Sequence, residues 1–215
     1  MIIAMPGIEM VLVFMAAALA LNLTPGPDML YVTARSISDG RAAGVLSAFG
    51  IAAGTLVHIT ALALGLAALL AAVLLAYDVV RLAGAIYLVA IGIQLLLRPR
   101  TAADVAELPR SRLGVIFAQA VVTNVLNPKV ALFFLAFLPQ FVDPAAGPPV
   151  PQIVFLGLLF NVQGTLVNVG VALLASRTTV WLRANERRVS LLQRLTGGIF
   201  VALGIRLAMV PRSVP

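Results

Sequence analysis

Six stretches of about twenty mostly apolar residues divide the sequence, and they constrain the fold more than any other feature. A helix that crosses a lipid bilayer needs roughly 20 such residues, because its side chains must face hydrocarbon. The chain of 215 residues is 61% hydrophobic and only 11% charged, whereas a soluble domain is about a quarter charged. We therefore predict one all-α integral membrane domain over residues 1–215, with six transmembrane helices at about 8–32, 42–76, 79–97, 113–138, 152–176 and 189–210.

Residue types that carry catalytic or metal chemistry are scarce. The sequence has no Cys, which excludes disulfides and thiolate metal sites, and its one His is too few for a histidine metal cage. No nucleophile-elbow, zinc-protease or phosphate-loop motif occurs. We therefore predict that the protein is not an enzyme and has no metal site and no cofactor. Transport without a nucleotide-binding loop would draw on an ion gradient.

Arginines gather in three of the connections between the stretches. Because basic residues stay on the cytoplasmic side of membrane proteins, we predict that these three connections face the cytoplasm and that both termini lie outside. The net charge of +7 is then a topology signal and not a nucleic-acid-binding patch. Only Arg81, Arg206 and Arg212 lie on the opposite side, and Lys129 lies within the fourth stretch. The arginines predicted to lie on the cytoplasmic side are Arg35, Arg41, Arg98, Arg100, Arg110, Arg112, Arg177, Arg183, Arg187, Arg188 and Arg194.

The two halves of the sequence resemble each other at three places in the same order. Pro25 matches Pro128 at an offset of 103 residues, Gly-Thr-Leu-Val recurs at 54–57 and 164–167, and Arg-Leu-x-Gly recurs at 81–84 and 194–197. Three helices per unit is an odd number, so the second unit must be inverted in the membrane. We predict inverted repeats at about 8–98 and 113–210, an arrangement typical of secondary transporters. The alternative is coincidence in a biased composition.

Prolines interrupt the first and fourth stretches. Each proline removes a backbone donor and blocks helical bonding to the preceding turn, and a glycine between two prolines lets the chain bend. The freed backbone groups cannot face lipid and must face protein or a wet cavity. The alternative is a pair of plain kinks. The residues predicted to bind substrate at these breaks are Thr24, Pro25, Gly26, Pro27, Asn127 and Pro128.

Asp28 and Lys129 follow the two breaks directly. A charge at mid-bilayer costs about 2.5–3.5 kcal/mol on insertion scales, so such residues usually face the interior and are functional. We predict a site for a zwitterionic solute, with its amine near Asp28 and its carboxylate near Lys129 or a helix N-terminus. The alternative is an ion pair that only holds the bundle together.

Further polar residues recur at helical spacing and predict faces directed into the bundle. Gln119 and Thr123 share a face with Asn127 in the fourth stretch, and Asn161 and Asn168 share one in the fifth. We include them in the predicted substrate pathway, although such stripes also serve to bond helices together.

His58 lies on a face of the second stretch with Gly50 and Gly54, small residues that allow close contact with another helix. The unperturbed pKa of histidine lies near 6.5, so His58 is a proton-coupling candidate beside Asp28. The alternative is a hydrogen-bonded core histidine. The glycine pairs Gly84/Gly92 and Gly197/Gly204 predict close packing, within the chain or in a homodimer.

Three segments carry a family resemblance: Asn-Leu-Thr-Pro-Gly-Pro-Asp-Met-Leu-Tyr-Val at 22–32, Gly-Ile-Ala-Ala-Gly-Thr-Leu-Val-His at 50–58, and Asn-Pro-Lys-Val-Ala-Leu-Phe-Phe-Leu-Ala-Phe-Leu-Pro-Gln-Phe at 127–141. The sequence resembles the LysE/RhtB family of amino-acid exporters over nearly its whole length, and its RhtB branch most. The Pro-Gly-Pro and Asn-Pro-Lys segments carry the resemblance together. The resemblance implies that the functional residues are those of the two matching segments, namely Pro25, Gly26, Pro27, Asp28, Asn127, Pro128 and Lys129.

The resemblance implies export of small amino acids, such as homoserine, threonine or leucine, across the bacterial inner membrane. It also implies proton antiport, so the expected partners are a small amino acid, protons and the lipid bilayer. Competing interpretations are an exporter of another metabolite or toxic amine, and a membrane scaffold or channel subunit.

Overall fold

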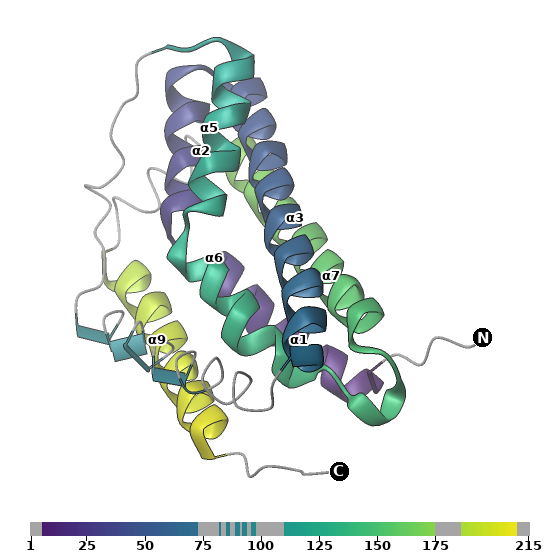
Figure 1. Ribbon diagram of the computed structural model, residues 1–215. Helices are drawn as coiled ribbons and strands as arrows, with labels where there is room; N and C mark the ends of the chain where they lie inside the picture. Colours follow the sequence, from purple (N-terminus) through teal and green to yellow (C-terminus); the bar gives the residue numbers. More distant parts are fainter. Residues whose placement is uncertain are drawn as a thin grey trace.

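The computed structural model describes residues 6–72, 110–174 and 186–209, together with residues 82, 85–86, 89–90, 92–93 and 96–97. Within these residues every regular element is helical, as the composition predicts. Figure 1 shows long helices lying side by side. Their bounds are α1 Ile8–Leu23, α2 Pro27–Ser38, α3 Arg41–Ala72, α5 Leu113–Val125, α6 Pro128–Leu132, α7 Pro149–Leu173 and α9 Glu186–Met209.

Both predicted breaks are present. Between α1 and α2 the helix axis bends by 49°, and between α5 and the segment from Pro128 to Phe141 it bends by 45°. After α6 the chain continues as a π-helix, η2 at Phe133–Phe137, and a 3-10 helix, η3 at Leu138–Phe141. A second 3-10 turn, η4 at Pro144–Ala146, leads to α7.

Two to four of the described helical units can cross a membrane by length and composition. Residues Arg41–Gly65 of α3 and Pro149–Leu173 of α7 qualify alone, and each bent pair qualifies as one further span. Helix α9 covers the sixth predicted stretch, but it is not among these candidate spans. Most of the third predicted stretch, 79–97, lies outside the described residues, and the residues described there are helical.

The two bent spans run in opposite directions. At one end, Ser111 just before α5 donates its backbone N–H to Asp39 just after α2, at 2.9 Å. At the other end, the rings of Phe14 in α1 and Phe141 in η3 lie 5.4 Å apart. Since α2 ends where α5 begins, and α1 begins where η3 ends, the two spans are antiparallel (Figure 1).

Helix α3 packs closely against α5 because two glycines face it. A Cβ on Gly50 would lie 2.6 Å from the Ala120 Cβ, and one on Gly54 would lie 2.8 Å from the Asn124 Cβ. Neither space accommodates a methyl group, so the glycines allow the two backbones to approach. This contact places His58, one turn further along α3, beside the second break.

Helix α3 also packs against α7 in the antiparallel sense. Gly44 near the beginning of α3 lies against Ala172 near the end of α7, and Ile59 lies against Gly157. Each of the first two spans of the first half is therefore antiparallel to its counterpart in the second half. The α1–α2 span is antiparallel to the α5–η3 span, and α3 is antiparallel to α7. Elsewhere, Gly92 lies against Gly197, and Gly204 against Ala85. These three predicted glycines therefore serve packing within the chain, while Gly84 lies outside the described residues.

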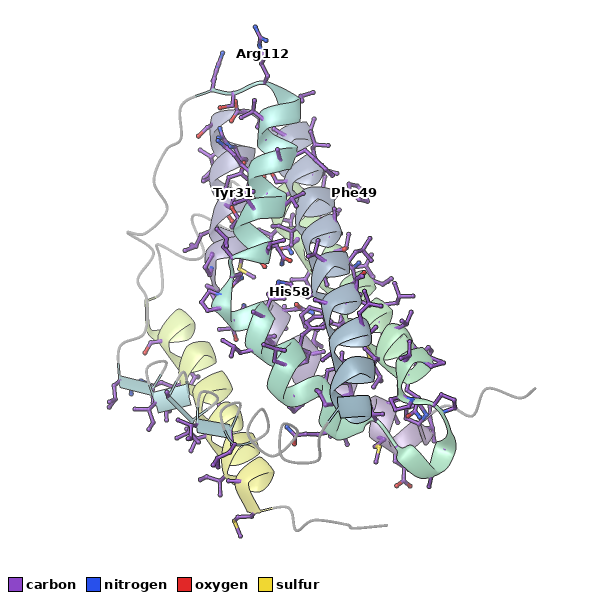
Figure 2. All side chains as sticks on the ribbon, viewed as in Figure 1. Tyr31, Phe49, His58 and Arg112 are labelled. Carbon is purple, nitrogen blue, oxygen red and sulfur yellow. The ribbon has the colours of Figure 1, made fainter. Side chains whose placement is uncertain are left out.

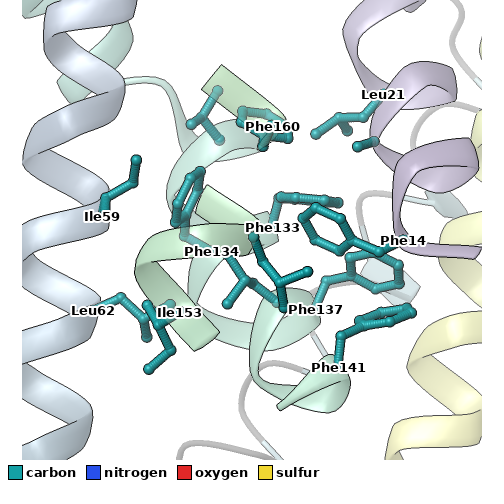
Figure 3. Packing of buried hydrophobic residues seen from close by; sticks show 14 of the residues in the cluster. Phe14, Leu21, Ile59, Leu62, Phe133, Phe134, Phe137, Phe141, Ile153 and Phe160 are labelled. Carbon is teal, nitrogen blue, oxygen red and sulfur yellow. The ribbon is translucent and has the colours of Figure 1, made fainter. Parts of the chain in front are cut away.

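Six phenylalanine rings of the hydrophobic core pack together around the segment that follows the second break (Figure 3). The ring centroids of Phe133 and Phe160 are 4.8 Å apart, and those of Phe137 and Phe141 are 4.7 Å apart. Such pairs stabilise a core by about 0.5–1.5 kcal/mol beyond the area they bury. We call these rings the aromatic cluster: Phe14, Phe133, Phe134, Phe137, Phe141 and Phe160.

Candidate functional site

The first break frees backbone carbonyls at the end of α1. Pro25 has no N–H to donate to Leu21, four residues before it, and α1 ends at Leu23 with Thr24 in an extended conformation. Leu21 O accepts instead from the Thr24 backbone N–H at 3.1 Å. Lys129 adds a side-chain donor, because its Nζ lies 3.0 Å from Leu21 O and 2.9 Å from Thr24 O. The C-terminal end of a helix carries partial negative charge, so a cation is favoured there.

The second break frees a carbonyl in the same way. Pro128 cannot donate to Asn124. The Asn124 carbonyl accepts instead from the Asn127 backbone N–H at 2.9 Å, and it also lies 3.1 Å from His58 Nε2. A carbonyl only accepts, so this contact requires the proton on Nε2. Asn127 caps the new helix α6, since its Oδ1 accepts from the Lys129 backbone N–H at 3.0 Å.

The two breaks are therefore alike in detail. Leu21 and Asn124 are separated by the same 103 residues as Pro25 and Pro128, and each carbonyl receives a side chain from a distant part of the chain. Figure 2 shows His58 on α3 at the level of the break between α5 and α6. The backbone cost of interrupting a membrane helix is offset by a side-chain donor at both places.

Asp28 lies in the first turn of α2 and is only 8% exposed. Its Oδ2 accepts from Asn124 Nδ2 at 2.8 Å, so a residue of the second break orients the carboxylate that follows the first. Asn124 Oδ1 lies 3.4 Å from Thr55 Oγ1 on α3. The other carboxylate oxygen, Oδ1, is buried and has no hydrogen-bond partner among the described residues, and the same holds for Asn127 Nδ2.

A polar cavity lies between the two breaks and α7. Its volume of about 20 Å³ suits about one water molecule, whereas small-molecule sites usually exceed ~300 Å³. The described conformation is therefore closed around the cavity. The lining residues are Asn22, Asp28, Met29, Ile51, Thr55, Asn124, Lys129, Val130, Phe160, Asn161, Gly164, Thr165 and Asn168.

Four of the residues predicted from the sequence line this cavity: Asp28, Lys129, Asn161 and Asn168. The predicted residues of the breaks do not line it but shape the backbone around it. Of these, Gly26 has a specific steric role, because a Cβ there would lie 3.1 Å from Lys129 Nζ. The residues that shape the backbone are Thr24, Pro25, Gly26, Pro27, Asn127 and Pro128.

Three predicted residues lie elsewhere in this conformation. Gln119 points to Arg35, whose guanidinium donates to its Oε1 at 2.7 Å. Thr123 donates to the backbone of its own helix at Gln119 O. His58 contacts the Asn124 carbonyl and stacks on Phe134 at 5.8 Å between ring centroids, which places it behind the cavity wall.

Sequence reasoning missed several polar lining residues. Asn22 and Asn124 each lie on a broken span, and Thr55 and Thr165 share the repeated Gly-Thr-Leu-Val motif. The signal was present, since amides and hydroxyls are rare in such apolar stretches. The repeat motif was interpreted as evidence of symmetry and not as a source of lining residues.

A second polar cluster joins α2 to α5 at the arginine-rich end. Arg35, only 3% exposed, forms an ion pair of 3.0 Å with Asp39, and it donates to the Tyr31 hydroxyl at 3.2 Å. The backbone N–H of Ser111 and the Arg35 guanidinium hold the pKa of Asp39 below its ordinary value. Figure 2 shows Tyr31 and Arg112 toward this end of the molecule. The cluster therefore holds the end of α2 against the beginning of α5.

Antiparallel interrupted spans around a polar cavity are typical of polytopic membrane transporters. A family model described as LysE type translocator matches residues 19–210, and the chain belongs to this family. The resemblance found in the sequence is thereby confirmed. The protein is a multi-pass bacterial membrane transporter and not an enzyme.

Curated relatives match nearly the whole chain. The homoserine/homoserine lactone efflux protein of Salmonella typhimurium is 32% identical over 196 residues, covering 91% of this chain and 94% of that protein. Its counterpart in Salmonella typhi is 31% identical, with the same coverage. An uncharacterised membrane protein of Pseudomonas aeruginosa is 30% identical over 197 residues, covering 89% of this chain and 91% of that protein. No solved structure matches the chain.

Proposed function

We propose that the protein exports small amino acids or their derivatives, of the homoserine, threonine or leucine type, in exchange for protons. The observation that carries the proposal is Asp28, a buried carboxylate at a helix break whose Oδ1 has no partner among the described residues. The names of the Salmonella relatives, which are homoserine efflux proteins, support the substrate class.

Asp28 gives this proposal its mechanism. One carboxylate oxygen is held by Asn124, the other has no hydrogen-bond partner among the described residues, and Asp28 lines the cavity. A proton on that oxygen and the ammonium of an amino acid compete for the same negative charge. If both cannot bind at once, proton entry releases the amino acid, which is antiport. Asn161 and Asn168 line the same cavity and supply amide donors and acceptors for the remaining polar groups of the solute. His58 is the second proton-coupling candidate, acting through the Asn124 carbonyl.

The architecture we propose is six spans in two inverted three-helix repeats in the inner membrane. The antiparallel pairing of the two bent spans, and of α3 with α7, supports this arrangement. The arginine-rich connections support cytoplasmic loops and external termini. Because the cavity is closed to about 20 Å³, export requires opening first to one side and then to the other.

Counterflow in proteoliposomes tests the proposal. The purified protein is assayed with a panel of amino acids, with and without a pH gradient. We expect saturable counterflow of small neutral amino acids and faster net export when the acceptor side is acidic. Flux that does not saturate indicates a channel, and chemical alteration of the solute indicates an enzyme. Either result, or the absence of any flux, contradicts the proposal.

A further inference from the structure

We propose that the cavity selects its substrate by the ammonium group alone and that Lys129 is a positioning residue for the end of α1, not an anchor for a substrate carboxylate. The inference rests on the proposed function and narrows its substrate class. It departs from the zwitterion site expected from the sequence, in which the substrate carboxylate lies near Lys129 or a helix N-terminus.

The first argument is where the Lys129 ammonium lies. Two of its three possible donor directions point at Leu21 O and Thr24 O, at 3.0 and 2.9 Å. Gly26 leaves the space for this contact, since a Cβ on Gly26 would lie only 3.1 Å from Nζ. Moving the ammonium to a substrate carboxylate would remove a donor from two carbonyls inside the membrane, which is unfavourable.

The second argument is the repeat. His58 does for Asn124 O what Lys129 does for Leu21 O, and the two carbonyls occupy matching positions before matching prolines. Histidine in this contact donates one N–H from Nε2. A shared role at both breaks explains Lys129 as a donor to the backbone without any substrate contact.

The third argument concerns the charged side chains that line the cavity. Among the described lining residues, Asp28 is the only carboxylate, and its Oδ1 is the charged atom that lacks a hydrogen-bond partner. Lys129 also lines the cavity, but its ammonium donates to Leu21 O and Thr24 O. The remaining polar lining groups are amides and hydroxyls, which can bind either a carboxylate or a neutral carbonyl. Arg35 does not line the cavity, because its guanidinium is bound to Asp39 and Gln119.

The substrate class that follows is small primary amines, with or without a carboxylate. An amino acid and its amide should be carried alike, because both present the ammonium to Asp28. An N-acetylated amino acid should be rejected, because it keeps the carboxylate but has no positive charge.

Competition in the counterflow assay tests this with the unmodified protein, using L-threonine, L-threonine amide and N-acetyl-L-threonine. We expect the amide to compete within about threefold of threonine, because no buried charge pair is lost. We expect N-acetyl-threonine to compete at least about thirtyfold more weakly, because Asp28 is then left without its cationic partner.

Lys129 variants separate positioning from substrate contact. In Lys129→Met we expect the maximal rate to fall by the same factor for threonine and its amide, with an unchanged ratio of their KM values. Lys129→Arg should restore part of the rate, because a guanidinium can also donate to two carbonyls. Gly26→Ala should lower the rate less than Lys129→Met does, because its Cβ would press on Nζ at 3.1 Å without removing the ammonium. Arg112→Met, at an exposed arginine, should leave transport unchanged.

Two results would overturn the inference alone: wild-type protein that carries threonine but rejects its amide, or Lys129→Met protein that loses threonine but keeps the amide. Transport of neither compound by the wild type would overturn the proposed function as well. If Lys129→Met does not fold, the competition assay on the wild type still decides.

Discussion

The two helix breaks are built alike but lead into different structures. Each begins with a proline that frees the carbonyl four residues earlier, and each freed carbonyl receives a side-chain donor, Lys129 at the first break and His58 at the second. After the first break the chain resumes as the regular helix α2, with Asp28 in its first turn. After the second it winds into the π-helix η2 and the 3-10 helix η3.

This difference separates two tasks. The first break places the Asp28 carboxylate in the lining of the polar cavity. The segment after the second break contributes most of the rings of the aromatic cluster. Phe160 of α7 belongs to both, because it lines the cavity and contacts Phe133. A π-helix rotates the following side chains relative to a plain α-helix, and such segments occur often at functional sites. The two breaks therefore share one backbone arrangement. Under the proposed function, substrate binding belongs to the first break, while the second break leads into aromatic packing.

The largest expected effect is at the first break. Asp28→Asn should lower amino-acid counterflow by at least about a hundredfold, since a buried ion pair with the substrate is lost. Glu9→Gln removes an exposed carboxylate from the same bent span and is the matched control, with no expected change. Substantial transport by folded Asp28→Asn protein would contradict the assignment of substrate binding to the first break.

The second prediction concerns the contribution of the aromatic cluster to stability. Phe137→Ala should reduce the free energy of unfolding by about 3 kcal/mol, because a fully buried ring is replaced by a cavity. Phe49, which is 53% exposed, provides the control substitution Phe49→Ala, with a much smaller effect. Thermal unfolding in detergent measures both. Equal losses would show that the aromatic cluster is no more tightly packed than the outer surface.

A third prediction compares the two side-chain donors. His58→Leu should slow transport by about tenfold, because the Asn124 carbonyl loses a donor beside Asp28. His58→Gln should keep most of the rate, since its amide N–H can reach the same carbonyl. If the Gln variant is as slow as the Leu variant and transport no longer depends on the pH gradient, His58 carries protons and is more than a backbone donor.

The smallest effect is expected where α2 and α5 meet at the arginine-rich end. The pKa of Asp39 is lowered by the Ser111 N–H and by Arg35, so this contact stabilises the fold above the unfolded-state pKa of Asp and is lost as the pH falls through the folded-state value. Asp39→Asn should therefore lower the Tm slightly at neutral pH and leave it unchanged in acid. A Tm difference that grows toward acid pH would contradict this sign.

Much of the fold followed from the sequence, because proline chemistry and apolar length act locally. The breaks at Pro25 and Pro128 and the close packing at Gly50 and Gly54 lie where the sequence predicts them. The six-span inverted repeat stays a prediction, since most of 79–97 lies outside the described residues and α9 is not among the candidate spans.

The site was harder to predict, because it depends on which helix faces which. The sequence indicated Lys129 as a charge near the cavity, but only tertiary contacts show its ammonium on the Leu21 and Thr24 carbonyls. Periodicity put Gln119 on the face of Asn127, yet Gln119, midway along α5, binds Arg35 of α2. The π-helix at Phe133–Phe137 has no turn residue that would announce it.

The most direct measurement uses the absence of native cysteine. Single substitutions Asn168→Cys, in the cavity lining, and Arg112→Cys, at an exposed helix end, are labelled with a membrane-impermeant thiol reagent in vesicles of both orientations. We predict that a transported amino acid slows labelling at position 168 and leaves labelling at position 112 unchanged. Labelling at position 168 that saturating amino acid does not alter would contradict a transport site between the two breaks.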